Sequence, residues 1–192
     1  MVTLPAPRPV VGARPCHRSL PLGNSVSRKG VSSMARRLRP VGLDFTQIAP
    51  VCLVFAREVA APPKTVFRAL AEDVGGWSEW FGAVTSARPV EDGAGREVRL
   101  KGGTRFRETV VVAKPAEVYA YRVDETNAPG MSALLEEWRL TPAGTGTRVQ
   151  WTFAADGPAV FRFVVNLGRA GLGRAFRDAV TSLDRRLAAT RA

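Results

Sequence analysis

The chain has 192 residues, of which 45% are hydrophobic and 23% are charged. This length suits one domain with its own core and is too short for a two-domain enzyme. No apolar run exceeds the nine residues 48–56, so we expect no stable membrane insertion. The formal net charge of +11 suggests a nucleic-acid partner, but eight basic residues and no acidic residue lie in residues 1–40. The other basic residues do not gather on one expected face among aromatic residues, and we therefore expect no nucleic-acid partner.

Histidine and cysteine are scarce, which excludes several kinds of site. His17 is the only histidine and lies beside Cys16, so residues 41–192 cannot form a Ser-His-Asp, Cys-His or HExxH site. Cys16 and Cys52 make neither a disulfide framework nor a metal-ligand spacing. We therefore expect a cytoplasmic protein without a metal ion or cofactor. Only four of the 28 basic residues are lysine, a bias that we attribute to a GC-rich bacterial genome.

Residues 1–40 contain six of the 14 prolines, five serines and no amphipathic period. Such a segment buries too little apolar surface to offset the entropy lost on ordering, which predicts a disordered basic tail before a domain at 41–192. A secretory signal would need an apolar stretch that this segment lacks, and its prolines argue against the helix of a transit peptide. Another interpretation is that the natural protein starts at Met34, which would make residues 1–33 upstream sequence.

The domain is predicted to begin with a strand at 51–59, rich in β-branched residues. Pro63 suits the first turn of a helix that extends to about Asp73 and is ended by a Gly-Gly pair. A short helix follows at 77–81, with its three aromatic residues on one side. The apolar period then changes from 3.6 to 2, which predicts an antiparallel meander of six strands joined by short turns. These strands are expected at 84–91, 95–101, 104–112, 117–124, 132–141 and 146–155.

The chain is predicted to end in a long amphipathic helix at about 158–189. Its apolar positions recur at spacings of three and four, and glycines at 168, 171 and 173 would bend it or let it approach the sheet closely. This order of elements would let a curved antiparallel sheet wrap around the helix and leave a space between them.

Several segments carry a family resemblance: 59–70, the Trp-Ser-Glu-Trp-Phe motif at 77–81, and 138–149 followed by Trp151, together with the terminal helix. On these segments the chain, from about Arg39 to Ala189, resembles the SRPBCC (START-like, helix-grip) superfamily, in its polyketide cyclase/dehydrase group. The resemblance implies an α+β fold in which about seven curved antiparallel strands wrap around a long C-terminal helix, with two short helices after the first strand. It implies no single activity, because the superfamily includes lipid carriers, cyclases, hydroxylase domains and stress-related binding proteins.

Alternation along the strands predicts which side chains face the concave side of the sheet. Closing each hairpin at its turn residues places one polar row across that side, Arg96–Glu108–Tyr121–Glu136–Trp151. The neighbouring rows are almost wholly apolar. Two carboxylates in such surroundings need partners or water. The row therefore indicates either a cleft whose polar groups orient a ligand or an ordinary cross-strand pair near the rim of the sheet.

Three functions remain open, and the sequence predicts no oligomeric state. The first is a carrier or sensor for a small hydrophobic ligand (lipid-like, aromatic or polyketide-like) held between the sheet and the terminal helix. The second is a metal-independent enzyme resembling polyketide cyclases/dehydrases, in which Glu108 or Glu136 removes a proton while Arg96 and Tyr121 stabilise the enolate. The third is a protein-interaction domain, for which we expect a cavity below about 300 Å³. The expected ligand-binding residues are Trp80, Phe81, Phe106, Tyr119, Tyr121, Trp138, Trp151, Phe161, Val165 and Phe176.

Overall fold

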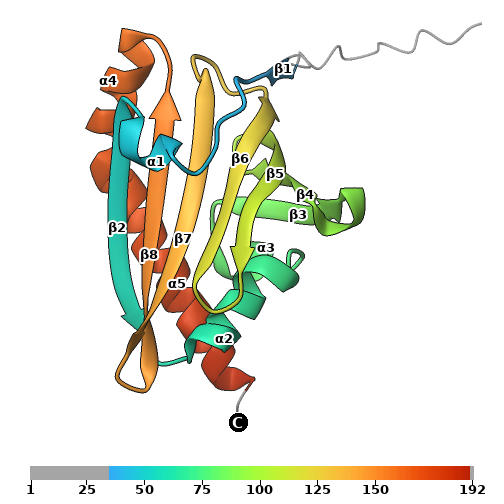
Figure 1. Ribbon diagram of the computed structural model, residues 1–192, viewed down its shortest axis with the longest axis vertical. Coiled ribbons are helices and arrows are strands. Elements are labelled where there is room, and N and C mark those ends of the chain that lie inside the picture. Colours follow the sequence, from blue (N-terminus) through green and yellow to red (C-terminus); the bar gives the residue numbers. More distant parts are fainter. Residues whose placement is uncertain (1–34, 191–192) are drawn as a thin grey trace, which may run out of the picture. The chain divides into compact units, whose positions relative to one another are not determined.

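The computed structural model describes residues 35–190, which form a curved antiparallel sheet with a long helix on one face (Figure 1). The strand order is β2-β8-β7-β6-β5-β4-β3, and a two-residue strand, β1, pairs with β6. The expected α+β helix-grip fold is thus confirmed. The strands are β1 (Arg36–Arg37), β2 (Val51–Val59), β3 (Val84–Val90), β4 (Gly95–Leu100), β5 (Arg105–Lys114), β6 (Val118–Thr126), β7 (Ala133–Ala143) and β8 (Gly146–Asp156). The helices are α1 (Phe45–Ile48), α2 (Pro63–Phe67), the π-helix η1 (Arg68–Glu72), α3 (Trp77–Trp80), the 3-10 helix η2 (Glu91–Gly93), α4 (Ala159–Leu167) and α5 (Arg169–Ala189).

Helix α5 packs its apolar side against the concave face of the sheet. The Phe176 ring stacks on Trp151 of β8 and Phe55 of β2, with centroid separations of 6.0 and 6.1 Å. Gly173, one turn earlier, is required by the close approach, since a Cβ there would come within 2.9 Å of the Phe55 ring. The buried residues of α5 recur at spacings of one, three and four and are Gly173, Phe176, Ala179, Val180, Leu183 and Leu187.

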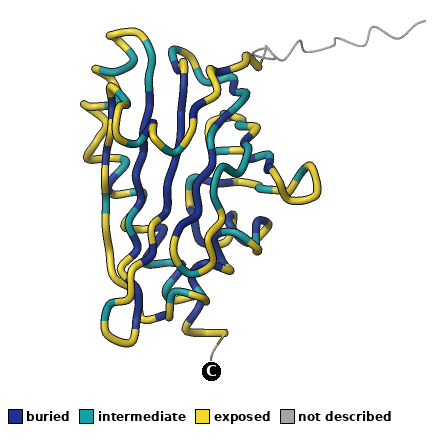
Figure 2. The backbone as a smooth tube through the Cα atoms, in the orientation of Figure 1, coloured by how far each residue is buried: buried dark blue, intermediate teal, exposed yellow. Residues whose placement is uncertain are grey.

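The outer face of the sheet is partly covered as well. Figure 2 shows buried residues concentrated along the strands at the centre of the sheet. A four-residue helix that the sequence did not predict, α1, places Phe45 on this outer face, together with Val41 from the preceding loop. These two residues form a small cluster with Ala133, Leu135 and Ala154. The outer cluster explains why β7 is buried on both faces near its start.

Two boundaries differ from those expected. β1 pairs with β6, and the N–H of the buried Leu38 donates to the carbonyl of Asp124 at 2.8 Å, so the domain begins before residue 41. The expected disordered tail falls largely on residues 1–34, which lie outside the described residues. The single helix expected at 158–189 is interrupted at Gly168, where φ is −74° and ψ is −1°. The composition of the N-terminal segment did not reveal β1, because a strand of two residues is too short to show an alternating pattern.

Candidate functional site

A cavity of about 320 Å³ lies between the concave face of the sheet, α3 and α5. Its wall is mainly apolar, with Trp77 from α3, Val98 from β4 and Leu172 from α5 among the lining residues. The polar residues that reach it from four adjacent strands are Arg96, Glu108, Tyr121 and Glu136. An apolar chamber with a few polar groups on one side is the usual form of a small-molecule site.

Arg96 and Glu108 form a buried ion pair across β4 and β5, at the predicted register. Arg96 Nε donates to Glu108 Oε2, and the two side chains are 2% and 3% exposed. The guanidinium lies between two aromatic rings, with its Cζ 4.0 Å from the centroid of Trp77 and 3.8 Å from that of Tyr121. Its Nη1 is buried without a hydrogen-bond partner among the described residues. The Nη1 donor group of this cation therefore remains unused.

Glu136 is the centre of a second polar group. The hydroxyl of Tyr121 donates to Glu136 Oε2 at 2.6 Å, and Trp151 Nε1 donates to the same oxygen at 3.1 Å. Trp138 Nε1 in turn donates to the Tyr121 hydroxyl oxygen at 3.1 Å. No hydrogen bond within the described residues reaches Glu136 Oε1. The pairing of Tyr121 with Glu136 across β6 and β7 confirms the predicted register there.

The two carboxyl groups differ in their electrostatic surroundings. Burial, followed by the charge of Glu108, raises the pKa of Glu136 from 4.5 to about 7. Burial also raises the pKa of Glu108, although the charge of Arg96 acts in the opposite direction. Burial lowers the pKa of Arg96, but the charges of Glu108, Tyr121 and Tyr119 and the hydrogen bond to Glu108 together more than offset this, so the net change is upward. Glu136 therefore exchanges a proton near neutral pH, while Arg96 keeps its charge.

Two other predicted cross-strand pairs are displaced by two residues. Glu108 lies opposite Val123, because the hairpin between β5 and β6 turns later than predicted, with Lys114 opposite Val118, and the bulge between Val110 and Val112 shifts the register back by one residue. Glu136 lies opposite Phe153, because the hairpin between β7 and β8 turns one residue later than predicted. A displacement by an even number of residues keeps every side chain on its predicted face. The polar residues therefore still meet on the concave side.

Of the ten expected ligand-binding residues, Phe81, Phe106, Tyr121 and Trp151 line the cavity. The other six are not among its lining residues, which corrects the expectation. Four of these lie in the core behind the wall and are at most 2% exposed: Trp80, Tyr119, Trp138 and Phe176. The remaining two, Phe161 and Val165, are half-buried on α4. Periodicity gives the face on which a side chain lies, but not its distance from a cavity.

The sequence-based set omitted several lining residues for which a signal existed. Trp77 lies three residues before Trp80, on the same side of the short helix, and contacts both the cavity and the Arg96 guanidinium. Leu172 falls four residues before Phe176 in the apolar pattern of the last helix. A third omitted lining residue, Met131, is an exception: it follows a turn-forming segment, and no periodic pattern in the sequence indicated it.

Within residues 35–190, no group of three or more His, Cys, Asp or Glu residues could hold a metal ion. The same part of the chain contains no helix with the length and hydropathy needed to cross a bilayer. Among the cavity residues, the groups available for chemistry are the unused donor of Arg96, the hydroxyl of Tyr121 and the carboxyl group of Glu136.

Two solved structures share this fold at low sequence identity. The protein XoxI from Bacillus cereus has a TM-score of 0.60 at 15% identity, with 74% of this chain and 99% of that chain covered. A START superfamily protein from Mycobacterium smegmatis has a TM-score of 0.59 at 12% identity, with 72% of this chain and 98% of that chain covered.

Sequence relatives extend over most of the chain. Uncharacterized proteins of Mycobacterium bovis and Mycobacterium tuberculosis are each 32% identical over 161 residues, which covers 78% of this chain and 94% of the relative. A family model described as polyketide cyclase/dehydrase and lipid transport matches residues 50–188, from β2 almost to the end of α5. The chain therefore belongs to the polyketide cyclase/dehydrase and lipid transport family.

Proposed function

We propose that the protein binds a small apolar ligand with one polar end in the cavity between the sheet and α5. The observation that carries this proposal is the cavity itself, about 320 Å³ in volume and largely apolar, with Arg96 and Glu136 among its lining residues. The volume lies just above the ~300 Å³ typical of the smallest ligand pockets, which favours a ligand site over a protein-interaction domain. The family description names both lipid transport and cyclase/dehydrase members, and is compatible with binding and with catalysis.

The polar groups favour a ligand with a neutral oxygen, such as a carbonyl or hydroxyl. Arg96 Nη1 has no partner among the described residues, so it can donate to a ligand oxygen. Glu136 accepts both of its hydrogen bonds on Oε2, so Oε1 can accept one from a ligand hydroxyl. The charge of Arg96 is already balanced by Glu108. A ligand carboxylate would therefore add an unpaired charge to the cavity, at a large desolvation cost.

A cavity-filling substitution tests the binding proposal. Ala175 lines the cavity from α5, whereas Ala188 is exposed on the same helix, so Ala175→Phe and Ala188→Phe form a matched pair. The probe is the uncharged apolar dye N-phenyl-1-naphthylamine, followed by its own fluorescence and by quenching of tryptophan emission, since Trp151 lines the cavity. We expect at least about tenfold weaker dye binding for Ala175→Phe and no change for Ala188→Phe. Equal dye binding by both variants would contradict the proposal. Independently of this test, native mass spectrometry of the purified protein would identify any ligand that it retains.

One observation favours a second function, an enzyme of the cyclase/dehydrase type: the pKa of Glu136 is about 7. A carboxylate with this pKa can remove a proton from the carbon beside a ligand carbonyl at neutral pH. The electron pair of the broken C–H bond moves to the carbonyl oxygen, and the resulting enolate is stabilised by Arg96, with Tyr121 beside it. Glu108 is less suited to the role of base, because Arg96 occupies its Oε2.

Replacing Glu136 by Gln separates the two functions. Gln keeps the shape of the side chain and removes the base, so an enzyme should lose about 10²- to 10⁴-fold in turnover of a β-ketone substrate with little change in binding. A carrier has no turnover, and the same change should alter ligand affinity by about 1–3 kcal/mol. Glu137→Gln, on the opposite face of β7, is the control. If the wild-type protein converts no β-ketone, the enzyme function is excluded while the binding proposal stands.

A further inference from the structure

Four large apolar side chains are exposed along one face of α4. Val160, Phe163, Val164 and Leu167 are 75%, 67%, 57% and 74% exposed, whereas only Ile48 and Val54 are also exposed large apolar residues in the described part of the chain. The positions i, i+3, i+4 and i+7 place the four side chains on one side of the helix. We call them the α4 stripe. A contiguous exposed apolar patch of this kind marks a surface that another structure covers.

The α4 stripe is not needed to hold the helix in place. The opposite face of α4 carries Phe161 and Val165, which pack against the main core. Phe161 lies so close to Gly130 and Gly157 that a Cβ on either glycine would come within 3.2 Å of a Phe161 atom. Figure 2 shows the exposed colour along α4, which Figure 1 places at the end of β8. One face of the helix is thus anchored and the other is free.

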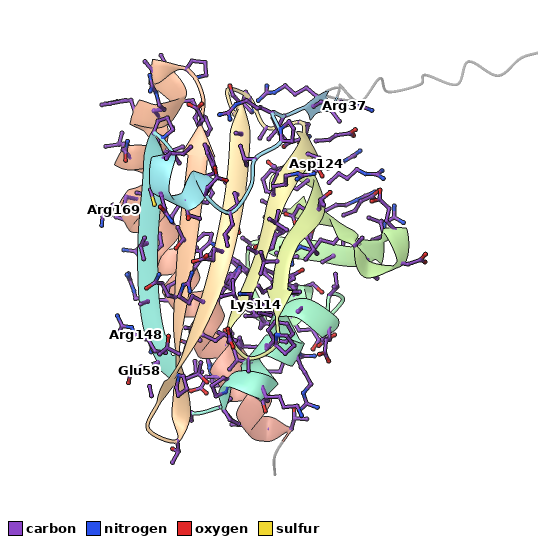
Figure 3. All side chains as sticks on the ribbon, viewed as in Figure 1. Arg37, Glu58, Lys114, Asp124, Arg148 and Arg169 are labelled. Carbon is purple, nitrogen blue, oxygen red and sulfur yellow. The ribbon has the colours of Figure 1, made fainter. Side chains whose placement is uncertain are left out.

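The chain around the stripe is basic. Residues 157–177 contain four arginines, Arg162, Arg169, Arg174 and Arg177, and no Asp or Glu. No ion pair joins any of these arginines to a carboxylate of the described residues, although nine ion pairs occur elsewhere in residues 35–190. Three of them, together with Leu167, line a surface hollow of about 480 Å³ where α4 meets α5. Figure 3 shows Arg169 directed away from the sheet at this junction.

We propose that the α4 stripe and these four arginines dock the protein on an anionic lipid bilayer. An apolar helix face flanked by arginines is the arrangement by which helices lie in the headgroup region of a membrane. Val160, Phe163, Val164 and Leu167 would enter the boundary between headgroups and acyl chains, and the arginines lining the hollow would contact lipid phosphates. Each basic side chain near an anionic surface adds attraction that salt screens. The surface is separate from the ligand cavity, so this inference stands whether or not the cavity proposal holds.

Charge argues against two other occupants of the α4 stripe. A second copy related by twofold symmetry would bring the same four arginines against one another, with no acidic residue in 157–177 to balance them. Residues 1–34 contain five basic residues and no acidic one, so that segment offers no complementary charge either. An anionic surface complements both the apolar stripe and the unpaired arginines.

Vesicle flotation with the full chain tests the proposal. The vesicles consist of phosphatidylcholine alone or of phosphatidylcholine with about 30% phosphatidylglycerol, and flotation is repeated at high salt, where screening is strong. We expect binding to the anionic vesicles only, and its loss at high salt. The double variant Phe163→Gln/Leu167→Gln should lower the partition coefficient at least about tenfold, because two large side chains no longer leave water. Arg169→Gln/Arg174→Gln should lower it by a similar factor.

Matched variants separate docking from misfolding and from general charge attraction. Val54→Gln changes an exposed apolar residue on β2, and Arg148→Gln an exposed arginine toward the other end of β8, as Figure 3 shows. Both controls should bind vesicles like the wild-type protein, and all variants should keep the wild-type thermal midpoint. If Phe163→Gln/Leu167→Gln bound anionic vesicles as strongly as the wild-type protein, the proposal would be overturned and the attraction would be assigned to other basic residues. Equal binding to neutral vesicles would overturn it too, as would a wild-type dimer in sedimentation velocity that Phe163→Gln/Leu167→Gln dissociates.

Discussion

Replacing Glu136 by Gln should stabilise the protein in a way that depends on pH. Glu136 is 9% exposed and has a pKa of about 7 in the folded protein, against 4.5 for the ordinary group. Between these two values the folded protein binds more protons than the unfolded chain, so its stability falls as the pH rises. The loss of stability caused by ionising the buried Glu136 is absent below about pH 4.5 and complete above pH 7. Gln carries no charge at any pH, so the variant escapes it.

The size of the effect follows from the interval between the two pKa values. This interval spans about 2.5 pH units, and at about 1.4 kcal/mol per unit it corresponds to roughly 3 kcal/mol. The free energy of unfolding of Glu136→Gln, relative to the wild-type protein, should therefore rise by about 2–3 kcal/mol between pH 5 and pH 8. For a domain of this size the relative thermal midpoint should rise by about 4–12 °C.

Urea titrations of both proteins at pH 5, 6, 7 and 8 measure this difference. Taking the difference between variant and wild type removes the titration of the groups that do not interact with Glu136. Glu137→Gln is the control, because Glu137 lies one residue along β7 on the opposite face and is paired with Arg139. The control should produce no such rise with pH. A difference for Glu136→Gln that stays level from pH 5 to pH 8 would refute the assigned pKa and, with it, the role of Glu136 as a base.

Other substitutions test the packing around the site, each by chemical denaturation. Arg96→Met should cost about 3–5 kcal/mol by leaving Glu108 buried without its partner, and adding Glu108→Leu should recover much of this loss. If the single variant were as stable as the wild type, the buried ion pair would be refuted. Phe176→Ala should cost about 3–5 kcal/mol, since its ring is fully buried beneath the sheet. Gly146→Ala would place a Cβ 2.1 Å from a carbonyl oxygen of β2 and should cost at least about 1–3 kcal/mol. Gly75→Ala meets nothing within 4 Å and should change stability by less than about 1 kcal/mol.

The sequence alone determined the meander, the faces of its strands and the residues of the polar row. Alternation with a period of two assigns each side chain to a face, and the hairpin turns bring consecutive strands together. For this reason Arg96, Glu108, Tyr121 and Glu136 were all expected on the concave side, where the structure has them. The errors in register at Glu108 and Glu136 were even-numbered, so they moved no residue to the wrong face.

Only the tertiary structure decided which of these residues have partners and how deep each one lies. Glu108 is held by Arg96, whereas Glu136 accepts hydrogen bonds from neutral groups and titrates near neutral pH. Trp138 and Trp151 are both directed inward, yet Trp151 lines the cavity and Trp138 lies behind its wall. A repeat along the chain specifies the direction of a side chain, but its neighbours come from strands and helices far apart in sequence. Burial and pKa depend on those neighbours, and therefore on how α3 and α5 pack against the sheet.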